Sequence, residues 1–456
     1  MARQRYRPVG ALLASALALG SCQSYAPAPL AEGPDLVTEA PRLSLPVQQL
    51  HIPGVASTYT FDPSRGLDMT GVAILAVSNN PQLRAERAKA GVARAQLFAA
   101  GLLPDPQLAL TFAHPIAGPA AVNAFSAGLN YLLDQVITRP AAKSAARAEV
   151  RAVDLDALWQ EWQVAQQARI FYAQVRSLEK QAALLERYRA LYTDAYDRSA
   201  RALTHGDLTL DVTGTNLVAL LDAEFRLDKM QQDLDKARHQ LAATLGLAPG
   251  TDLPLADGGD PPAPDDDEVR AAMAALVDRR ADLLALKAGY ESQEARLRQA
   301  VLAQFPSLTV GVTEARDNTG IYGIGPSVTL GLPFFNGNRG KIAIEQATRT
   351  RLGAEYQARI DATVGEVDQL RILHAELTQQ LARLRQRLPL LESMAEKARR
   401  AYAARDLAAA SYLQLEQTLL NQQIGAITVE ESLIETRIGL QTLLGMPIGS
   451  ASGAAP

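Results

Sequence analysis

Two kinds of hydrophobic pattern follow one another along this chain, and the pair occurs twice. Apolar and polar side chains alternate at about residues 106–113, 123–136, 306–314 and 324–335, which predicts four β-strands. Much longer stretches with helical spacing follow each pair of strands. Residues 141–205 contain neither glycine nor proline, so at 1.5 Å per residue they predict a helix of about 100 Å. The apolar residues of this stretch that keep near one helical face are Leu155, Leu158, Val164, Ile170, Val175, Leu178 and Leu184.

The strands have one apolar face and one face of small or hydroxyl residues. Leu308, Val310 and Val312 fall on one side, and Thr309 and Thr313 on the other. This pattern fits a barrel wall with lipid outside and water inside, although a half-buried strand of a soluble protein shows it too. Four strands cannot close a barrel, and an open sheet edge is not tolerated in hydrocarbon. We therefore expect several identical chains to share one barrel, and three chains would supply twelve strands.

The two halves of the chain are copies of one sequence unit. At a shift of about 200 residues Leu83 corresponds to Leu283, and near the end of each unit Asp207 corresponds to Asp406. A period this long indicates two large structural units rather than a solenoid. We expect a signal peptide at residues 1–21, an extended arm at 22–66, a first repeat at 67–249, a linker at 250–268, a second repeat at 269–447 and a flexible tail at 448–456.

The N-terminus carries the features of a bacterial lipoprotein signal. Three arginines within residues 3–7 precede an apolar run at 9–19, which is too short to span a bilayer but has the length of a signal-peptide core. The run ends in Leu19-Gly20-Ser21-Cys22, which resembles a lipobox. In that reading Cys22, the only cysteine of the chain, carries a diacylglycerol and an N-acyl chain, and Gln23 indicates sorting to the outer membrane. A secretory signal that contains a cysteine by chance is the alternative.

Composition and motifs argue against other classes of protein. A net charge of −4 gives no support to a nucleic-acid partner. The five histidines lack metal-ligand spacing, and no phosphate-binding glycine loop, nucleophile elbow or paired carboxylates stand out. We therefore expect no catalytic residue, no metal site and no cofactor beyond the lipid on Cys22. Trp159 and Trp162 are interpreted as packing between helices.

In several segments of both repeats, the chain resembles the TolC-type family of outer-membrane efflux factors. Two of the motifs further resemble the CzcC-like branch, which serves heavy-metal efflux pumps: residues 101–106 and 333–340. The segments that carry the family resemblance are Asn80-Pro81-Gln82-Leu83, Gly101-Leu102-Leu103-Pro104-Asp105-Pro106-Gln107-Leu108, Arg280-Ala281-Asp282-Leu283, Phe305-Pro306-Ser307-Leu308 and Leu332-Pro333-Phe334-Phe335-Asn336-Gly337-Asn338-Arg339-Gly340.

The resemblance implies a mainly α-helical fold with a small transmembrane β part. It implies a homotrimer in the outer membrane of a Gram-negative bacterium, with a twelve-stranded barrel and a helical barrel in the periplasm. It also implies docking, through the helix-turn-helix tips, onto a periplasmic adaptor that couples the duct to an inner-membrane transporter. The tip positions here are His205, Gly206, Asp207, Leu208, Arg405, Asp406, Leu407 and Ser411.

Charged residues near these tips are candidates for the aperture that closes the resting channel: Asp207, Asp211, Asp406 and Glu416. Each of them also suits an ordinary solvated helix end or N-cap, which is the alternative. Pro389, inside the second long helix, is expected to kink it.

The function predicted from the sequence is a passive exit duct of a tripartite efflux system, with heavy-metal cations as the expected substrate. A duct for drugs or other organic compounds is one alternative, because selectivity in a wide lumen belongs mostly to the partners. A coiled-coil lipoprotein scaffold without a pore is another.

Overall fold

The computed structural model describes residues 25–38, 66–117 and 122–448. The predicted signal peptide, Cys22, most of the arm and residues 449–456 of the tail lie outside these ranges. Contacts divide the chain into residues 1–36 and 37–456. Residues 25–36 form no helix or strand, and the helices and strands of the described residues all belong to the larger unit.

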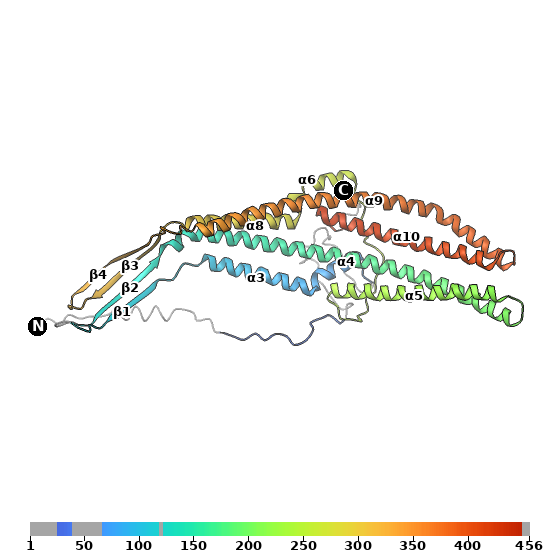
Figure 1. The fold of residues 1–456 in the computed structure, drawn as a ribbon, viewed down its shortest axis with the longest axis horizontal. Helices are drawn as coiled ribbons and strands as arrows, with labels where there is room; N and C mark the ends of the chain where they lie inside the picture. The colour runs from blue at the N-terminus through green and yellow to red at the C-terminus, as the bar shows by residue number, and fades with distance from the viewer. Residues whose placement is uncertain (1–24, 39–65, 118–121, 449–456) are drawn as a thin grey trace. The chain divides into compact units, whose positions relative to one another are not determined.

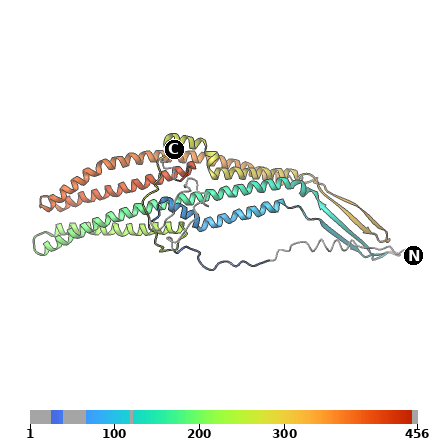
Figure 2. The ribbon, with the colours of Figure 1, turned by 180° about the vertical axis from the view of Figure 1, so that it is seen from behind.

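The larger unit consists of long helices and one small sheet (Figures 1 and 2). In chain order its elements are α2 (Met69–Asn79), α3 (Pro81–Gly101), β1 (Gln107–Ala113), β2 (Ala124–Leu132), α4 (Leu133–Thr204), α5 (Leu210–Thr244), α6 (Asp266–Ala274), α7 (Leu276–Arg279), α8 (Ala281–Leu302), β3 (Ser307–Arg316), β4 (Tyr322–Gly331), α9 (Arg339–Ala403) and α10 (Ala409–Leu444).

The order of elements repeats, so that α3, β1, β2, α4 and α5 correspond to α8, β3, β4, α9 and α10. The two longest helices, α4 and α9, have 72 and 65 residues. The predicted mainly α fold with four strands is confirmed. No helix among the described residues combines the length and the apolar character needed to cross a membrane.

Three predicted boundaries were wrong. The second strand ends at Leu132 rather than near residue 136. Two adjacent leucines, Leu132 and Leu133, break the alternation there, and Asp134 lies in the first turn of α4, where a carboxylate suits the helix dipole. Helix α4 then continues through Pro140.

The fourth strand ends at Gly331 rather than near residue 335. Pro333 has no N–H to donate to a strand neighbour, and Phe334 N donates instead to Leu332 O in a turn. The linker is also shorter than predicted, because Asp265 forms a capping box with Glu268 and so starts α6 inside the expected linker.

The four strands form one antiparallel sheet in the order β1-β2-β3-β4. The two repeats meet where β2 pairs with β3, with Leu129 opposite Val312. The sheet lies at one end of the long helices, and the turns α4–α5 and α9–α10 lie at the other (Figure 1). Its outer edges, β1 and β4, pair with no other strand among the described residues.

The largest buried cluster surrounds α2, which is apolar on all sides. Met69, Val72 and Leu75 of this helix are fully buried against residues of α4, α5 and α10, including Tyr172, Leu241 and Ile438. A helix that is apolar all round needs neighbours on every face. This short helix therefore ties the two repeats together near the middle of the long helices.

Candidate channel wall and docking tips

The register of the sheet gathers the apolar residues of all four strands on one face. Leu110 lies opposite Ala127, and Val310 opposite Val328. Many of these side chains are exposed in the single chain; Phe112 is 74 % exposed and Val328 is 64 % exposed. The larger apolar members of this face are Leu108, Leu110, Phe112, Phe125, Leu129, Tyr131, Leu308, Val310, Val312, Ile324, Val328 and Leu330, and Glu314, Arg316 and Tyr322 lie on the same face at its loop end. An apolar face this continuous requires a hydrophobic environment.

The opposite face carries only small or uncharged polar side chains apart from Leu132. Its larger polar members are Gln107, Thr111, Ser126, Asn130, Thr309, Thr313, Ser327 and Thr329. Many of the other residues on this face are glycines, and side chains of neighbouring strands lie close to several of them. A Cβ added to Gly311 would overlap Asn130 Oδ1 and approach Ser327 Oγ to 2.8 Å. This close approach from both flanking strands is expected on the concave side of a curved sheet.

Replacing Gly311 by valine should therefore disturb the sheet. We expect a destabilisation of about 1–3 kcal/mol, the usual effect of overpacking, read out as a lower temperature at which the assembled protein dissociates on gels. Gly323→Val on the same face is the matched control, since a Cβ there meets no atom within 4 Å. Equal dissociation temperatures for the two variants would contradict the proposed curvature.

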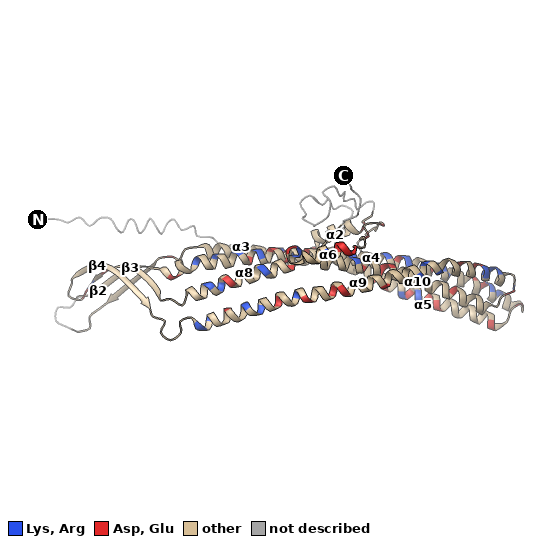
Figure 3. Cartoon of the chain, turned by 90° about the horizontal axis from the view of Figure 1, so that it is seen from above, with Lys and Arg blue, Asp and Glu red and all other residues tan. Residues whose placement is uncertain are grey.

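Aromatic residues gather at the loop end of the sheet. The rings of Phe112 and Phe125 lie 4.9 Å apart, and the Arg316 guanidinium lies 5.4 Å from the centre of the Tyr322 ring. Glu314 and Arg316 are the only charged residues in the four strands, whereas charges run along the helices (Figure 3). Aromatic residues with charges beyond them are typical of the edge of a membrane-spanning band.

The predicted tips have the same backbone in both repeats. Gly206 and Arg405 each adopt a left-handed conformation, and Asp207 N donates to Ala202 O at 2.9 Å as Asp406 N donates to Ala401 O at 2.8 Å. These bonds form Schellman motifs that end α4 and α9. His205, Asp207, Asp406 and Ser411 are also exposed, while Leu208 and Leu407 are half-buried beneath them.

The aperture candidates occupy two different environments. Asp207, Asp211 and Asp406 are exposed on the tips. Glu416, in contrast, is 7 % exposed and lies beside Tyr412, inside the helix bundle. Burial raises the pKa of Glu416, and a hydrogen bond with Tyr412 partly offsets that rise. In the single chain, therefore, three of the four candidates are exposed at the tips and the fourth is buried, and the aperture role of all four stays a prediction.

A buried ion-pair cluster joins the start of α8 to α9 and α10. The side chain of Arg280 is fully buried and donates to both carboxylate oxygens of Asp282, at 2.9 and 2.6 Å. It also donates to Thr363 Oγ1 at 2.7 Å and to Leu443 O at 3.1 Å, and its guanidinium lies 5.0 Å from the Trp159 ring centre.

The charge state of this cluster follows from its hydrogen bonds. Burial alone would raise the pKa of Asp282, but hydrogen bonds from Arg280 and Arg359 outweigh it and hold that pKa below its usual value. Sequence reasoning used this segment only as a family motif and missed the cluster.

The first repeat makes the corresponding contact with a neutral residue. Asn80 aligns with Arg280, caps α3 through its Oδ1, and donates from Nδ2 to Thr244 O at 2.9 Å. The two repeats therefore share one contact. The residue that precedes α3 or α8 donates a hydrogen bond to a free backbone carbonyl near the end of the last helix of the same repeat, α5 or α10. The alignment of the two motifs could have indicated this shared role.

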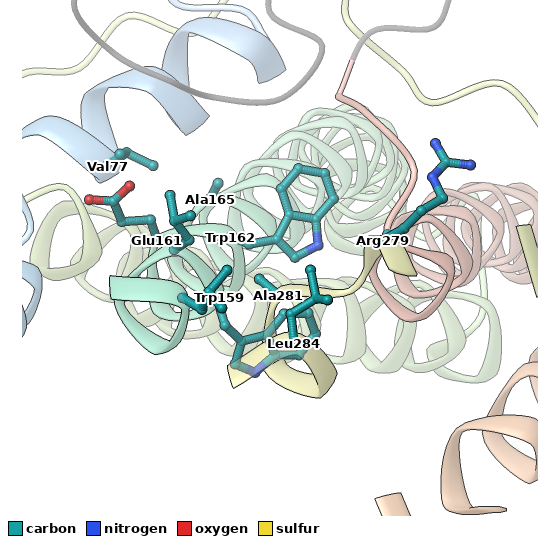
Figure 4. Close-up of a pocket in the computed structure, with 11 residues that line it drawn as sticks. Val77, Trp159, Glu161, Trp162, Ala165, Arg279, Ala281 and Leu284 are labelled. Atoms are coloured by element: carbon teal, nitrogen blue, oxygen red, sulfur yellow. The ribbon is translucent and has the colours of Figure 1, made fainter. Parts of the chain in front are cut away.

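The tryptophans predicted to pack between helices do so. Trp159 and Trp162 of α4 are buried and line an apolar cavity of about 210 Å³ together with Val77, Ala281 and Leu284 (Figure 4). Among the described residues, no group of three or more His, Cys, Asp or Glu side chains is placed to hold a metal ion.

Comparison with known proteins agrees with this geometry. Residues 273–446 match the family model described as outer membrane efflux protein. No curated protein matches the chain.

Three solved structures with similar folds are channels rather than enzymes. CusC is 20 % identical, covers 86 % of this chain and 96 % of its own, and has a TM-score of 0.68. The outer-membrane channel OprN is 16 % identical, with coverage of 91 % and 98 % and a TM-score of 0.70. The CmeC outer membrane channel of Campylobacter jejuni is 15 % identical, with coverage of 94 % and 96 % and a TM-score of 0.70. At these identities the likeness establishes the fold.

Proposed function

We propose that the chain is an outer-membrane efflux factor of the TolC type, the exit duct of a tripartite efflux pump, which the match of residues 273–446 to the efflux-protein model and the shared fold support. The observation that carries this proposal is the sheet: it has one apolar and one polar face, and no strand of the described residues pairs with its two edges. Such a sheet is stable in a bilayer only when its edges are paired. Three copies, joined β1 to β4, would close a twelve-stranded barrel around a water-filled lumen.

The helices extend the duct toward its partners. In the proposed trimer α4, α5, α9 and α10 line up beneath the barrel and carry both tips to the end away from the membrane. There they would dock onto a periplasmic adaptor and, through it, an inner-membrane transporter. The protein would then reside in the outer membrane of a Gram-negative bacterium, with most of its mass in the periplasm.

Heavy-metal cations are the proposed substrate, supported by the CzcC-like motifs at residues 101–106 and 333–340. The test is the growth inhibition of a deletion strain by zinc, cadmium, cobalt and copper salts, compared with a panel of drugs. Increased sensitivity to metals alone supports the proposal. Increased sensitivity to drugs alone shifts the substrate to organic compounds.

The duct itself is tested with the purified protein. We expect a trimer whose gel migration changes on heating and which produces discrete conductance steps in planar bilayers. A monomer that produces no conductance would support a scaffold without a pore.

The proposed anchor gives a separate prediction. Cys22→Ser should abolish labelling by a radioactive fatty acid, because the thiol that accepts the diacylglycerol is lost. The trimer should still form, since the barrel rather than the lipid holds it in the membrane. Mass spectrometry of the mature N-terminus and the heat-shift gel check both points. Recovery of unassembled monomer alone would contradict this division of roles.

A further inference from the structure

The apolar cavity beside the two tryptophans has the size of a single substituted aromatic ring. Its volume of about 210 Å³ exceeds the roughly 150 Å³ of an engineered apolar cavity that binds benzene. The walls come from both repeats: α2 and α4 of the first, and the start of α8 and the residue after α10 of the second. Most lining side chains are aliphatic or aromatic, including Val77, Leu155, Leu158 and Leu284. A cavity of this kind favours an apolar ligand.

One wall of the cavity is held in place before any ligand enters. The centre of the Trp159 ring lies 5.0 Å from the Arg280 guanidinium and 5.9 Å from that of Arg359. Both arginines donate to Asp282, so these cation–π contacts belong to the buried ion-pair cluster and restrain the indole. A ligand that packs against Trp159 therefore does not have to order this side chain.

The other indole offers a hydrogen-bond donor that the described part of the chain does not use. Trp162 is 8 % exposed, and its Nε1 has no acceptor among the described residues. Figure 4 shows this nitrogen on the side of the ring that faces Ala281, whereas the Glu161 carboxylate points away from it and bonds Arg87 at 2.8 Å. A buried indole N–H usually has a partner. A buried water needs about two to four polar partners, so an apolar wall with one donor better suits the oxygen of an organic molecule.

We propose that this cavity binds a small, uncharged aromatic molecule with one acceptor oxygen, such as an aryl ketone. Its ring lies against Trp159, and its oxygen accepts a hydrogen bond from Trp162 Nε1. An anion is disfavoured, because the arginines of the neighbouring cluster are already paired with Asp282, and the exposed Arg279 side chain extends away from the tryptophans (Figure 4). An unpaired charge is costly to bury. The ligand contacts α4 and α8 together and so stabilises the packing of the two repeats, whether or not the protein is a duct.

The test uses the full-length protein in detergent and two probes followed by fluorine NMR. The first, para-fluoroacetophenone, carries a ketone oxygen; the second, para-fluoroethylbenzene, has a similar shape without it. Trp162→Phe keeps an aromatic ring and removes the N–H. We expect this variant to bind the ketone about fivefold more weakly than the wild type does, the usual loss for one hydrogen bond. Its affinity for the hydrocarbon should be unchanged. Comparing the variant with the wild type for each probe cancels partitioning into the detergent.

Two leucine variants locate the site. Ala281→Leu fills the cavity and should remove saturable binding of both probes. Ala285→Leu, one turn further along α8 and outside the cavity wall, makes the same change and should bind both probes as the wild type does. The chain has two tryptophans and both line the cavity, so their fluorescence shows whether each variant keeps its fold there.

Three results would overturn the proposal. Equal ketone affinity in the wild type and Trp162→Phe would show that the N–H does not bind the oxygen, whether or not Ala281→Leu folds. Saturable binding that persists in folded Ala281→Leu would place the probes elsewhere. No saturable binding to the wild type would show that water or a neighbouring copy of the chain occupies the cavity. Conductance of the protein without probes tests the proposed function separately, so failure of one proposal does not imply failure of the other.

Discussion

Replacing Arg280 by methionine should destabilise the protein by about 3 kcal/mol or more, in the range measured when one partner of a buried ion pair is removed. The variant leaves Thr363 Oγ1 and Leu443 O without their donor, and Asp282 keeps only its 2.8 Å contact with Arg359. Methionine fills a similar volume, so the loss reflects the polar contacts rather than a cavity. Unfolding in guanidinium, followed by the fluorescence of Trp159 and Trp162, measures the change.

Arg359→Met is the matched control. Its side chain is 38 % exposed and bonds Asp282 through one nitrogen, so water can replace that contact and the effect should stay at or below about 1 kcal/mol. Destabilisation by Arg359→Met equal to that of Arg280→Met would show that the cluster does not depend on the buried arginine.

A charge on the apolar face of the sheet should have an effect of similar size. Val310→Arg places a guanidinium near the middle of β3, on the face that we assign to lipid. An arginine at the bilayer midplane of a barrel costs about 2–4 kcal/mol. We expect a marked loss of assembled trimer in the outer membrane, measured by the heat-shift gel.

Thr309→Arg, one residue earlier on the same strand, provides the comparison. Its side chain falls on the polar face, opposite Thr329 of β4, where an arginine stays hydrated. Assembly should be nearly normal. Equal loss in both variants, or greater loss for Thr309→Arg, would reverse the assignment of the faces.

The strands were predictable because their chemistry alternates residue by residue. Apolar Val310 and polar Thr309 indicate the two faces of their strand without any knowledge of distant contacts. The ends of two strands were predicted wrongly for local reasons. Leu132 and Leu133 break the alternation of the second strand, and Pro333 has no N–H for a hydrogen bond to a neighbouring strand. Strand ends of this kind are found only when the preferences of single residues are considered together with the hydrophobic periodicity.

The buried clusters were less predictable, since their partners are far apart in the sequence. Arg280 bonds residues 83 and 163 positions away, and nothing in its own segment identifies them. Glu416 is different, because Tyr412, Leu419 and Leu420 share its helical face and are buried with it. That spacing could have placed Glu416 in the bundle rather than at the aperture.

Conductance shows directly whether the polar face of the sheet lines a shared aqueous lumen. In the Cys22→Ser background, which has no other cysteine, Thr309→Cys and Val310→Cys trimers are placed in planar bilayers and treated with a charged thiol reagent. We expect a step decrease in conductance for Thr309→Cys and no change for Val310→Cys. A decrease for Val310→Cys with none for Thr309→Cys, or no difference between the two, would contradict it.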